Sequence, residues 1–142
     1  MYGKILISVD GSDSNKVAVD DGLKLAKEMG SEVTALYVFD MGEYLNPVYA
    51  PSLPNEKHIR ESSEMVLNYV IDQANSMGVK LRTKVSMGNP ASVIIEETKK
   101  YDLLVCGTLG KTGLSRALMG SVAERVVRYS NCPVLVSRNP TK

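Results

Sequence analysis

Short apolar runs alternate with stretches of helical periodicity along the whole chain. Five runs have the length and composition of strands: "KILISV" at 4–9, "EVTALYVF" at 32–39, "VKLRTKVS" at 79–86, "DLLVC" at 102–106 and "PVLVS" at 133–137. Between them, apolar residues recur every three or four positions, as do Val19, Leu23 and Ala26, which is typical of one buried helix face. The pattern therefore predicts the order β-α-β-α-β-α-β-α-β.

Residues with strong end preferences bound the predicted helices. Gly30 and Gly78 follow the first two helical stretches, where left-handed C-caps are common. Asn89-Pro90 offers an N-cap and a first helical residue for the third. Ser121 and Glu124 match the S-x-x-E pattern, which predicts a capping box at the start of a helix over about 121–130. Since helices separate all five strands, we expect one α/β domain over 1–142, a doubly wound parallel sheet with helices on both faces.

Composition excludes some classes of partner. Lysine plus arginine (17) nearly cancels aspartate plus glutamate (16), so no field of one sign favours nucleic acid or a membrane surface. No apolar run approaches the length of a membrane span, and the opening "KILISVD" leaves no room for a signal peptide. With two cysteines and no C-x-x-C pair, we expect a cytoplasmic protein. His58 is the only histidine, so no histidine pair can form a metal site or a dyad.

The segment "VCGTLGKTGLSRALMGSVAER" carries the strongest candidate chemistry. Its G-K-T is not a P-loop, because Val105 stands where that motif needs a glycine. The four glycines would nevertheless let backbone N–H groups converge on an anion, and the following helix N-terminus would add a partial positive charge. The same residues also fit ordinary turns and a helix cap.

Asp10 ends the first strand and is followed by Gly11. Its carboxylate could accept hydrogen bonds from ribose hydroxyls or help to hold a metal, and it could equally serve as the Asx residue of a turn. If the first and fourth strands are neighbours where strand order reverses, Asp10 and Gly107 face one crevice. Doubly wound sheets bind their ligands at that place.

The spacing Gly107-x2-Gly110-x9-Gly120-Ser121 resembles the nucleotide-binding motif of universal stress proteins, in particular the ATP-binding branch. The likeness runs from "KILISVDGSDSN" through "ALYVFD" to the closing strand, and it implies the strand order 3-2-1-4-5. One departure is Thr108-Leu109, where relatives usually carry a serine and then a basic or histidine side chain. Leu109 removes a donor that relatives have there, and Lys111 or Arg116 could supply the charge instead.

The resemblance also implies roles for individual residues. Ser8 and Asp10 would line an adenosine pocket with Asp10 near the ribose, and Val38 would contact adenine through its backbone. Cys106 would form the pocket floor. ATP, together with Mg²⁺, is the implied cofactor, and Asp10 is a candidate metal ligand beside the phosphates. The phosphate-binding set, with its neighbouring residues, is Gly107, Thr108, Gly110, Lys111, Gly113, Gly120, Ser121 and Val122.

The function implied by the resemblance is an ATP-binding regulatory protein of the stress-response type. It would act as a nucleotide-dependent dimeric switch toward an unknown protein partner, paired through the apolar edge strand at 133–138. No general base stands out, so at most slow or partner-assisted hydrolysis is expected. The alternatives are a dimeric scaffold that binds no nucleotide and a nucleotidyl- or phosphotransferase. The long segment 40–56 is a candidate lid.

Overall fold

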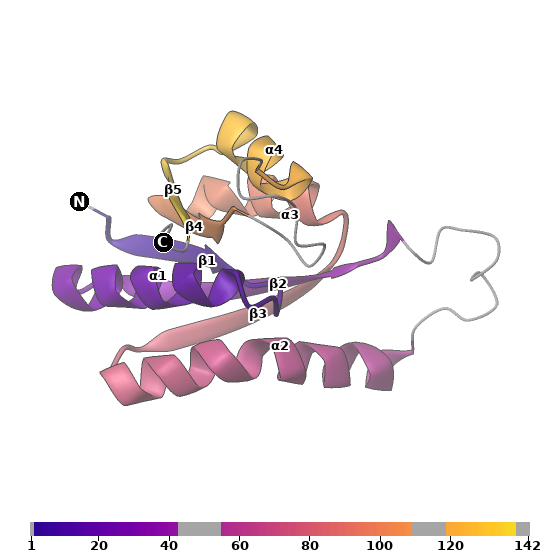
Figure 1. Cartoon of the computed structure of the whole chain (residues 1–142), viewed down its shortest axis with the longest axis horizontal. Coiled ribbons are helices and arrows are strands. Elements are labelled where there is room, and N and C mark those ends of the chain that lie inside the picture. The colour runs from indigo at the N-terminus through magenta and orange to yellow at the C-terminus, as the bar shows by residue number, and fades with distance from the viewer. Residues whose placement is uncertain (1, 43–54, 109–118, 139–142) are drawn as a thin grey trace.

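A computed structural model describes residues 2–42, 55–108 and 119–138 of the chain. The strands and helices alternate as the hydrophobic pattern predicts (Figure 1). The strands are β1 (Lys4–Ser8), β2 (Glu32–Asp40), β3 (Leu81–Gly88), β4 (Leu103–Gly107) and β5 (Val134–Ser137). The helices are α1 (Asn15–Met29), α2 (Glu56–Met77), α3 (Pro90–Glu97) and α4 (Ser121–Tyr129), with a one-turn 3₁₀ helix, Thr98–Lys100, after α3.

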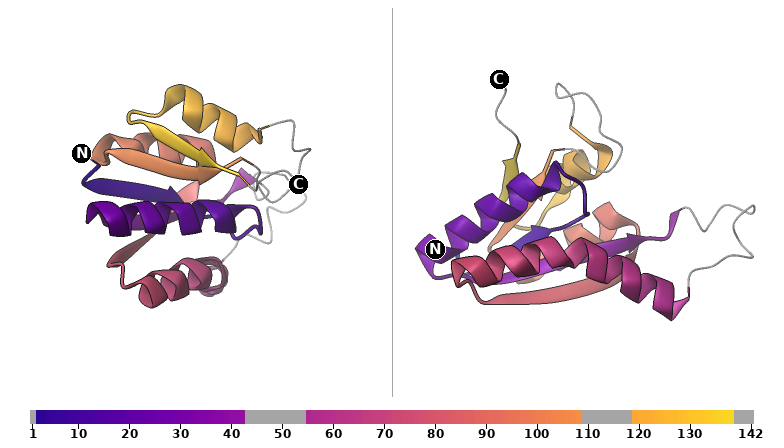
Figure 2. Two further views of the ribbon diagram at one scale, coloured as in Figure 1. Left: turned by 60° about the vertical axis from the view of Figure 1, so that its left-hand side comes forward. Right: turned by 60° about the horizontal axis from the view of Figure 1, so that its bottom comes forward.

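The five strands form one parallel sheet in the order β3-β2-β1-β4-β5. This confirms the expected order 3-2-1-4-5. The central strand β1 sets Ile7 opposite Ala35 of β2 on one side and opposite Val105 of β4 on the other. Helices α1 and α2 cover one face of the sheet, and α3 and α4 cover the other (Figures 1 and 2).

The sheet separates two apolar clusters. Along β1, Ile5 and Ile7 point into the cluster under α1 and α2, whereas Leu6 points into the cluster under α3 and α4. All three side chains are fully buried. A strand covered on both faces needs apolar residues at successive positions, which explains the continuous run that β1 shows in the sequence.

Three helix ends follow the predicted caps, and β3 begins later than predicted. Gly30 and Gly78 are left-handed, with φ of 66° and 70°, and the Asn89 side chain accepts a hydrogen bond from the Ser92 N–H. β3 begins two residues later than predicted. The reason is that the Val79 N–H bonds to the Ala74 carbonyl at 2.9 Å, so the chain is still leaving α2 at that point.

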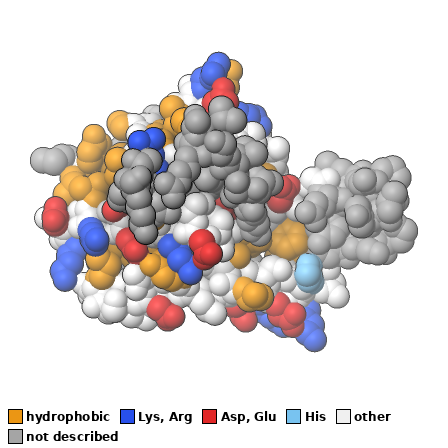
Figure 3. Space-filling view, in the orientation of Figure 1, with side chains coloured by type: hydrophobic (Ala, Val, Ile, Leu, Met, Phe, Trp, Pro, Cys, Tyr) orange, Lys and Arg blue, Asp and Glu red, His pale blue; other side chains and the backbone are white. Residues whose placement is uncertain are grey.

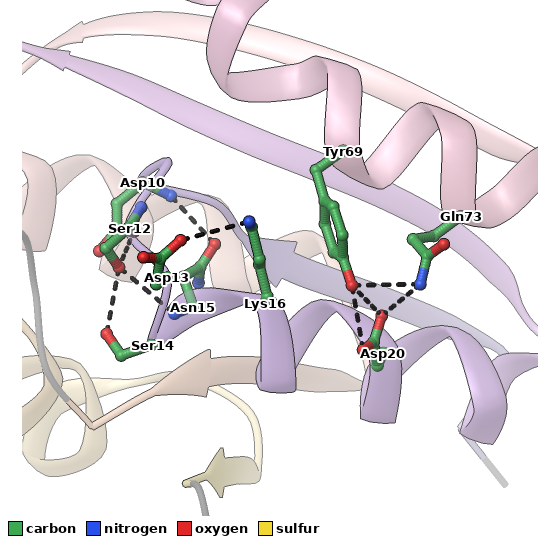
Figure 4. Close-up of polar contacts among 9 residues, drawn as sticks. All are labelled: Asp10, Ser12, Asp13, Ser14, Asn15, Lys16, Asp20, Tyr69 and Gln73. Carbon is green, nitrogen blue, oxygen red and sulfur yellow. Dashed lines mark hydrogen bonds and ion pairs between the residues drawn. The ribbon is translucent and has the colours of Figure 1, made fainter.

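A polar cluster joins α1 to α2 (Figure 4). The Tyr69 hydroxyl donates to Asp20 Oδ1 at 2.8 Å, and Gln73 Nε2 donates to the same oxygen at 2.8 Å. Lys16 Nζ lies 5.2 Å from the centre of the Tyr69 ring. Burial and the bond to Asp20 raise the pKa of Tyr69, so its hydroxyl remains a donor at neutral pH. The cluster therefore fixes α2 against α1.

A buried carboxylate joins α3 to β3. Glu97 is 8% exposed, and its oxygens accept hydrogen bonds from Lys84 Nζ at 2.8 and 3.0 Å. Lys100 Nζ lies 3.5 Å from Glu97 Oε1. Burial opposes ionisation of Glu97, but the hydrogen bond and charge of Lys84, with help from Lys100, hold its pKa below the usual range. The group is therefore ionised in the folded protein at neutral pH.

Replacing this carboxylate with an amide, Glu97→Gln, is expected to lower the free energy of unfolding at pH 7 by about 1–2 kcal/mol. A hydrogen bond to a charged group contributes roughly 1.5–3 kcal/mol, and the partly exposed Lys84 amine reduces that figure through solvent screening. Because folding depresses the pKa of Glu97, its contribution is present above the unfolded-state pKa and is lost as pH falls through the folded-state pKa. Urea unfolding of the wild type and of Glu97→Gln, from neutral pH down through the folded-state pKa of Glu97, measures the difference in their free energies of unfolding.

The matched control is Glu96→Gln, one residue earlier on α3. Glu96 pairs only with the neighbouring Lys99 among its described contacts, and both side chains are well exposed. We expect a change below about 0.5 kcal/mol for this variant. A Glu97→Gln deficit that stayed constant from neutral to acid pH would show that the ion pair is not its cause.

Candidate functional site

The carboxyl ends of β1 and β4 form the point where strand order reverses. The two strands are paired, yet the chain leaves β1 for α1 on one face of the sheet and leaves β4 for α4 on the other (Figure 2). Such a point is the usual ligand site of a doubly wound sheet. Asp10 follows β1 by two residues, and Gly107 ends β4. The structure thus brings these two predicted residues to the same edge.

The segment from Ser8 to Asn15 is a tightly bonded turn (Figure 4). Asp10 Oδ1 accepts hydrogen bonds from the Ser12 N–H at 2.8 Å and from Ser12 Oγ at 2.6 Å. Gly11, with φ of 82°, supplies the left-handed residue that the turn needs. The Asx-turn role of Asp10 is therefore confirmed. Its second oxygen, Oδ2, has no hydrogen bond within the described residues, so it can still accept one from a ligand.

Asn15 holds this turn in place. It is 4% exposed, its Oδ1 accepts from the Asp10 N–H at 3.2 Å, and its Nδ2 donates to the Ser8 carbonyl at 2.9 Å. The sequence reasoning did not single out Asn15. A signal was present, because Asn15 continues the buried stripe formed by Ala18, Val19, Gly22, Leu23 and Ala26 on α1. A polar residue on such a stripe must find buried partners.

Val38 and Cys106 lie beneath the edge on the α3/α4 face. They are 8% and 4% exposed, and both belong to the apolar cluster on that face. Burial raises the pKa of the Cys106 thiol to about 12. At neutral pH it is a protonated apolar side chain instead of a nucleophile or metal ligand. This environment suits the floor of a pocket.

The β4–α4 connection is closed by a backbone hydrogen bond. The Gly120 N–H donates to the Thr108 carbonyl at 2.7 Å, so the ends of the glycine-rich segment are held together at the carboxyl edge. Gly120 is buried and extended, with φ of −63° and ψ of 158°. α4 begins directly after it, and Ser121 and Val122 are exposed in its first turn.

The predicted capping box is wrong. Gly120, not Ser121, is the N-cap of α4, because its extended conformation and its bond to Thr108 set the start of the helix. The Glu124 side chain points along the helix and pairs with Arg128 at 2.9 Å. A glycine cap brings no side-chain oxygen to the first N–H groups of α4. Within the described residues no side-chain oxygen caps those donors, so they and the helix dipole could serve an external anion.

Several predicted residues lie outside the described part of the chain. They are Leu109, Gly110, Lys111, Gly113 and Arg116, together with most of the candidate lid at 40–56. The predicted residues that the structure does gather at the carboxyl edge come from four segments. They are Ser8, Asp10, Val38, Cys106, Gly107, Thr108, Gly120, Ser121 and Val122.

Acidic and basic side chains are interspersed on the face of the molecule that Figure 3 shows. Arg125, one turn into α4, is exposed, and its guanidinium donates to Asn89 Oδ1 at 3.3 Å and to Ser92 Oγ at 3.5 Å, which ties α4 to the start of α3. His58, pale blue in Figure 3, is exposed as expected. Within 2–42, 55–108 and 119–138, no cluster of three or more metal-ligating side chains forms.

No helix in the described residues is long and apolar enough to cross a membrane. The two cysteines are both free thiols.

The candidate site as a whole is an edge of backbone donors with one available carboxylate oxygen, the Oδ2 of Asp10, and an apolar floor. Such a set can hold an anionic ligand that also has hydroxyl donors and a flat apolar part.

Comparisons with known proteins show what the sequence and the fold are similar to. The model of the universal stress protein family matches residues 1–138. The universal stress protein MJ0531 of Methanocaldococcus jannaschii is 42% identical over 145 residues, which is 100% of this chain and 85% of that protein.

Solved structures are similar as well. Universal stress protein UspA from Lactobacillus plantarum superposes with a TM-score of 0.82 at 28% identity, over 96% of this chain and 98% of that one. A universal stress protein family protein from Arabidopsis thaliana, solved with AMP bound, has a TM-score of 0.65 at 21% identity, over 96% of this chain and 92% of that one. The first likeness extends over nearly the full length of both chains.

Proposed function

The chain belongs to the universal stress protein family, and from this premise we propose that it is an ATP-binding regulatory protein that acts as a nucleotide-dependent dimeric switch. One observation carries the proposal. The Thr108–Gly120 hydrogen bond holds the start of α4 at the carboxyl edge where Asp10 begins the turn that follows β1. A relative solved with AMP bound supports adenine nucleotides as the ligand class.

Each part of the proposed site has a matching part of the nucleotide. The available Asp10 Oδ2 would accept from ribose hydroxyls, and the Val38 backbone would contact the adenine ring above the Cys106 floor. The N–H groups of Ser121 and Val122 at the glycine-capped α4 terminus would donate to phosphate oxygens. Gly107, Gly110, Lys111 and Gly113 complete the proposed phosphate set, though the last three lie outside the described residues.

Magnesium fits this set of donors. Mg²⁺ binds proteins through one or two carboxylates together with substrate phosphates and waters. Asp10 Oδ1 already accepts from Ser12, so Asp10 would hold the ion through Oδ2, as the alternative to the ribose contact. When bound, the ion would neutralise part of the phosphate charge. The proposed switch needs binding alone and requires no rapid hydrolysis.

The proposed dimer would form through β5 and its flanks, residues 133–138. β5 is an edge strand of the sheet, and Leu135 on it is 39% exposed. An apolar edge strand without a neighbour can pair with another chain. A twofold axis would let β5 of one copy pair with β5 of the other.

Titration of nucleotide-stripped protein with ATP and Mg²⁺ in a calorimeter tests the proposal. We expect binding in the micromolar range, and sedimentation of the same sample is expected to give the mass of a dimer. GTP is the control, because backbone contacts around Val38 should favour the adenine edge. A dimer that binds no ATP would instead support the scaffold function. A monomeric mass would contradict the proposed dimer interface.

A further inference from the structure

Ser137 is a buried hydroxyl that lacks a partner. It ends β5 and is 5% exposed. Among the described residues, its Oγ is the one buried side-chain oxygen or nitrogen with no hydrogen bond. A buried hydroxyl without a partner costs free energy. Ser137 is therefore suited to donate to an acceptor that the described residues do not supply.

Its position is beside the first glycine of the proposed phosphate segment. Ser137 pairs directly with Gly107 in the β4–β5 ladder. Since both are the last residues of their strands, the Ser137 hydroxyl lies at the carboxyl edge. Gly107 has no side chain to stand between this hydroxyl and a ligand at the edge.

The side chain of Ser137 points to the α1 face. Val134 and Val136 pack against the cluster under α3 and α4, whereas Leu135 pairs with Val105 of the opposite cluster. Because strand side chains alternate, Ser137 shares the face of Leu135. Helix α1 contacts β5 on that face and begins at the edge where β5 ends (Figure 2).

The local charge on that side is compatible with an anion. The N-terminus of α1 carries a partial positive charge, and its first turn contains no acidic residue. Asp13, which precedes the helix, is paired with Lys16 at 3.2 Å. Asp10 is the negative group at this edge: its Oδ1 accepts from the Ser12 N–H and hydroxyl, and its Oδ2 is assigned above to ribose hydroxyls or Mg²⁺, either of which would separate it from the phosphates.

We propose that Ser137 is an additional ligand-binding residue whose hydroxyl donates a hydrogen bond to a phosphate oxygen of the bound nucleotide. This inference rests on the proposed function and deepens it. A phosphate oxygen is a strong acceptor, and a donor in a water-excluded position binds it more strongly than an exposed one. Ser137 would therefore favour nucleotides over the nucleoside.

Titration of Ser137→Ala with ATP and with adenosine tests the inference. The dissociation constant for ATP is expected to rise about tenfold or more, as for the loss of one hydrogen bond to a charged group. The constant for adenosine is expected to stay unchanged, because the hydroxyl contacts only phosphate. Ser137→Thr keeps the hydroxyl and is expected to retain ATP binding close to that of the wild type.

Ser31→Ala is the matched control at the opposite edge of the sheet. The Ser31 hydroxyl bonds to the Tyr2 carbonyl, and its loss should change neither constant. An equal loss of ATP and adenosine binding in Ser137→Ala would overturn the inference in favour of a packing role. Unchanged ATP binding in Ser137→Ala would also overturn the inference, because the hydroxyl would then make no hydrogen bond to the phosphate. Wild-type protein that bound neither compound would overturn the proposed function itself.

Discussion

Replacing Gly120 with valine, Gly120→Val, is expected to weaken ATP binding at least about 100-fold. Gly120 is buried at the start of α4, and the N–H groups that follow it are the proposed phosphate donors. A valine side chain there would block close approach of an anion. Losing two hydrogen bonds to a charged group, at about 1.5–3 kcal/mol each, corresponds to a factor of about 100 or more. Calorimetric titration with ATP and Mg²⁺ measures the change.

The backbone at Gly120 permits this substitution. The φ of −63° and ψ of 158° at Gly120 lie in a region open to any residue, and the backbone bond to Thr108 needs no glycine. Gly3→Val, at the exposed opposite edge, serves as the control. The nearest atom to an added Cβ at Gly3 is Asp102 Oδ2 at 3.5 Å, an ordinary contact. If Gly120→Val bound ATP like Gly3→Val, the helix start would not be the phosphate site.

Gly22→Val is expected to lower the free energy of unfolding by about 2–3 kcal/mol. Gly22 lies where α1 crosses β1, and a Cβ there would stand 2.7 Å from Cδ1 and 3.0 Å from Cγ1 of the fully buried Ile7. Overpacking a filled core costs roughly 1–3 kcal/mol or more. The helix propensity of valine is better than that of glycine, but this offsets only a few tenths of a kcal/mol of the loss. Thermal and urea unfolding measure the loss.

Lys24→Val separates the packing effect from the residue type. Lys24 lies two positions further along α1 and is exposed, so valine there meets no core atom. We expect its stability to change by less than about 0.5 kcal/mol. Similar denaturation midpoints for Gly22→Val and Lys24→Val would mean that the α1–β1 contact can relax around the added side chain.

Local sequence patterns were sufficient for the fold and for part of the site. The alternation of apolar runs with helical stripes requires covered parallel strands, and Gly30, Gly78 and Asn89 were predicted correctly because caps depend on neighbouring residues. The family resemblance supplied the strand order. In that order β1 and β4 are neighbours, so Asp10 and Gly107 lie together at the carboxyl edge of the sheet.

Features that depend on distant contacts were not predictable in the same way. The start of α4 is set by the bond between Thr108 and Gly120, which lie twelve positions apart in the printed sequence, so the local S-x-x-E match at Ser121 was misleading. Ser137 looked like any strand-end serine. Its lack of a partner follows only from the packing of α1 and β4 around it. Asn15 could have been found from its place on the buried stripe of α1.

The central place of β1 in the sheet has a consequence for synthesis on the ribosome. β1 emerges first, but its neighbour β4 emerges about 100 residues later, as the bond from the Lys4 N–H to Asp102 illustrates. Until then, the edge of β1 that pairs with β4 is open, and on the α3/α4 face only α3, which emerges just before β4, can cover Leu6 and Leu36. Domains generally fold as units during translation, and exposed apolar strands favour aggregation. The nascent chain is therefore most in need of chaperone protection after β3 has emerged and before β4 is complete.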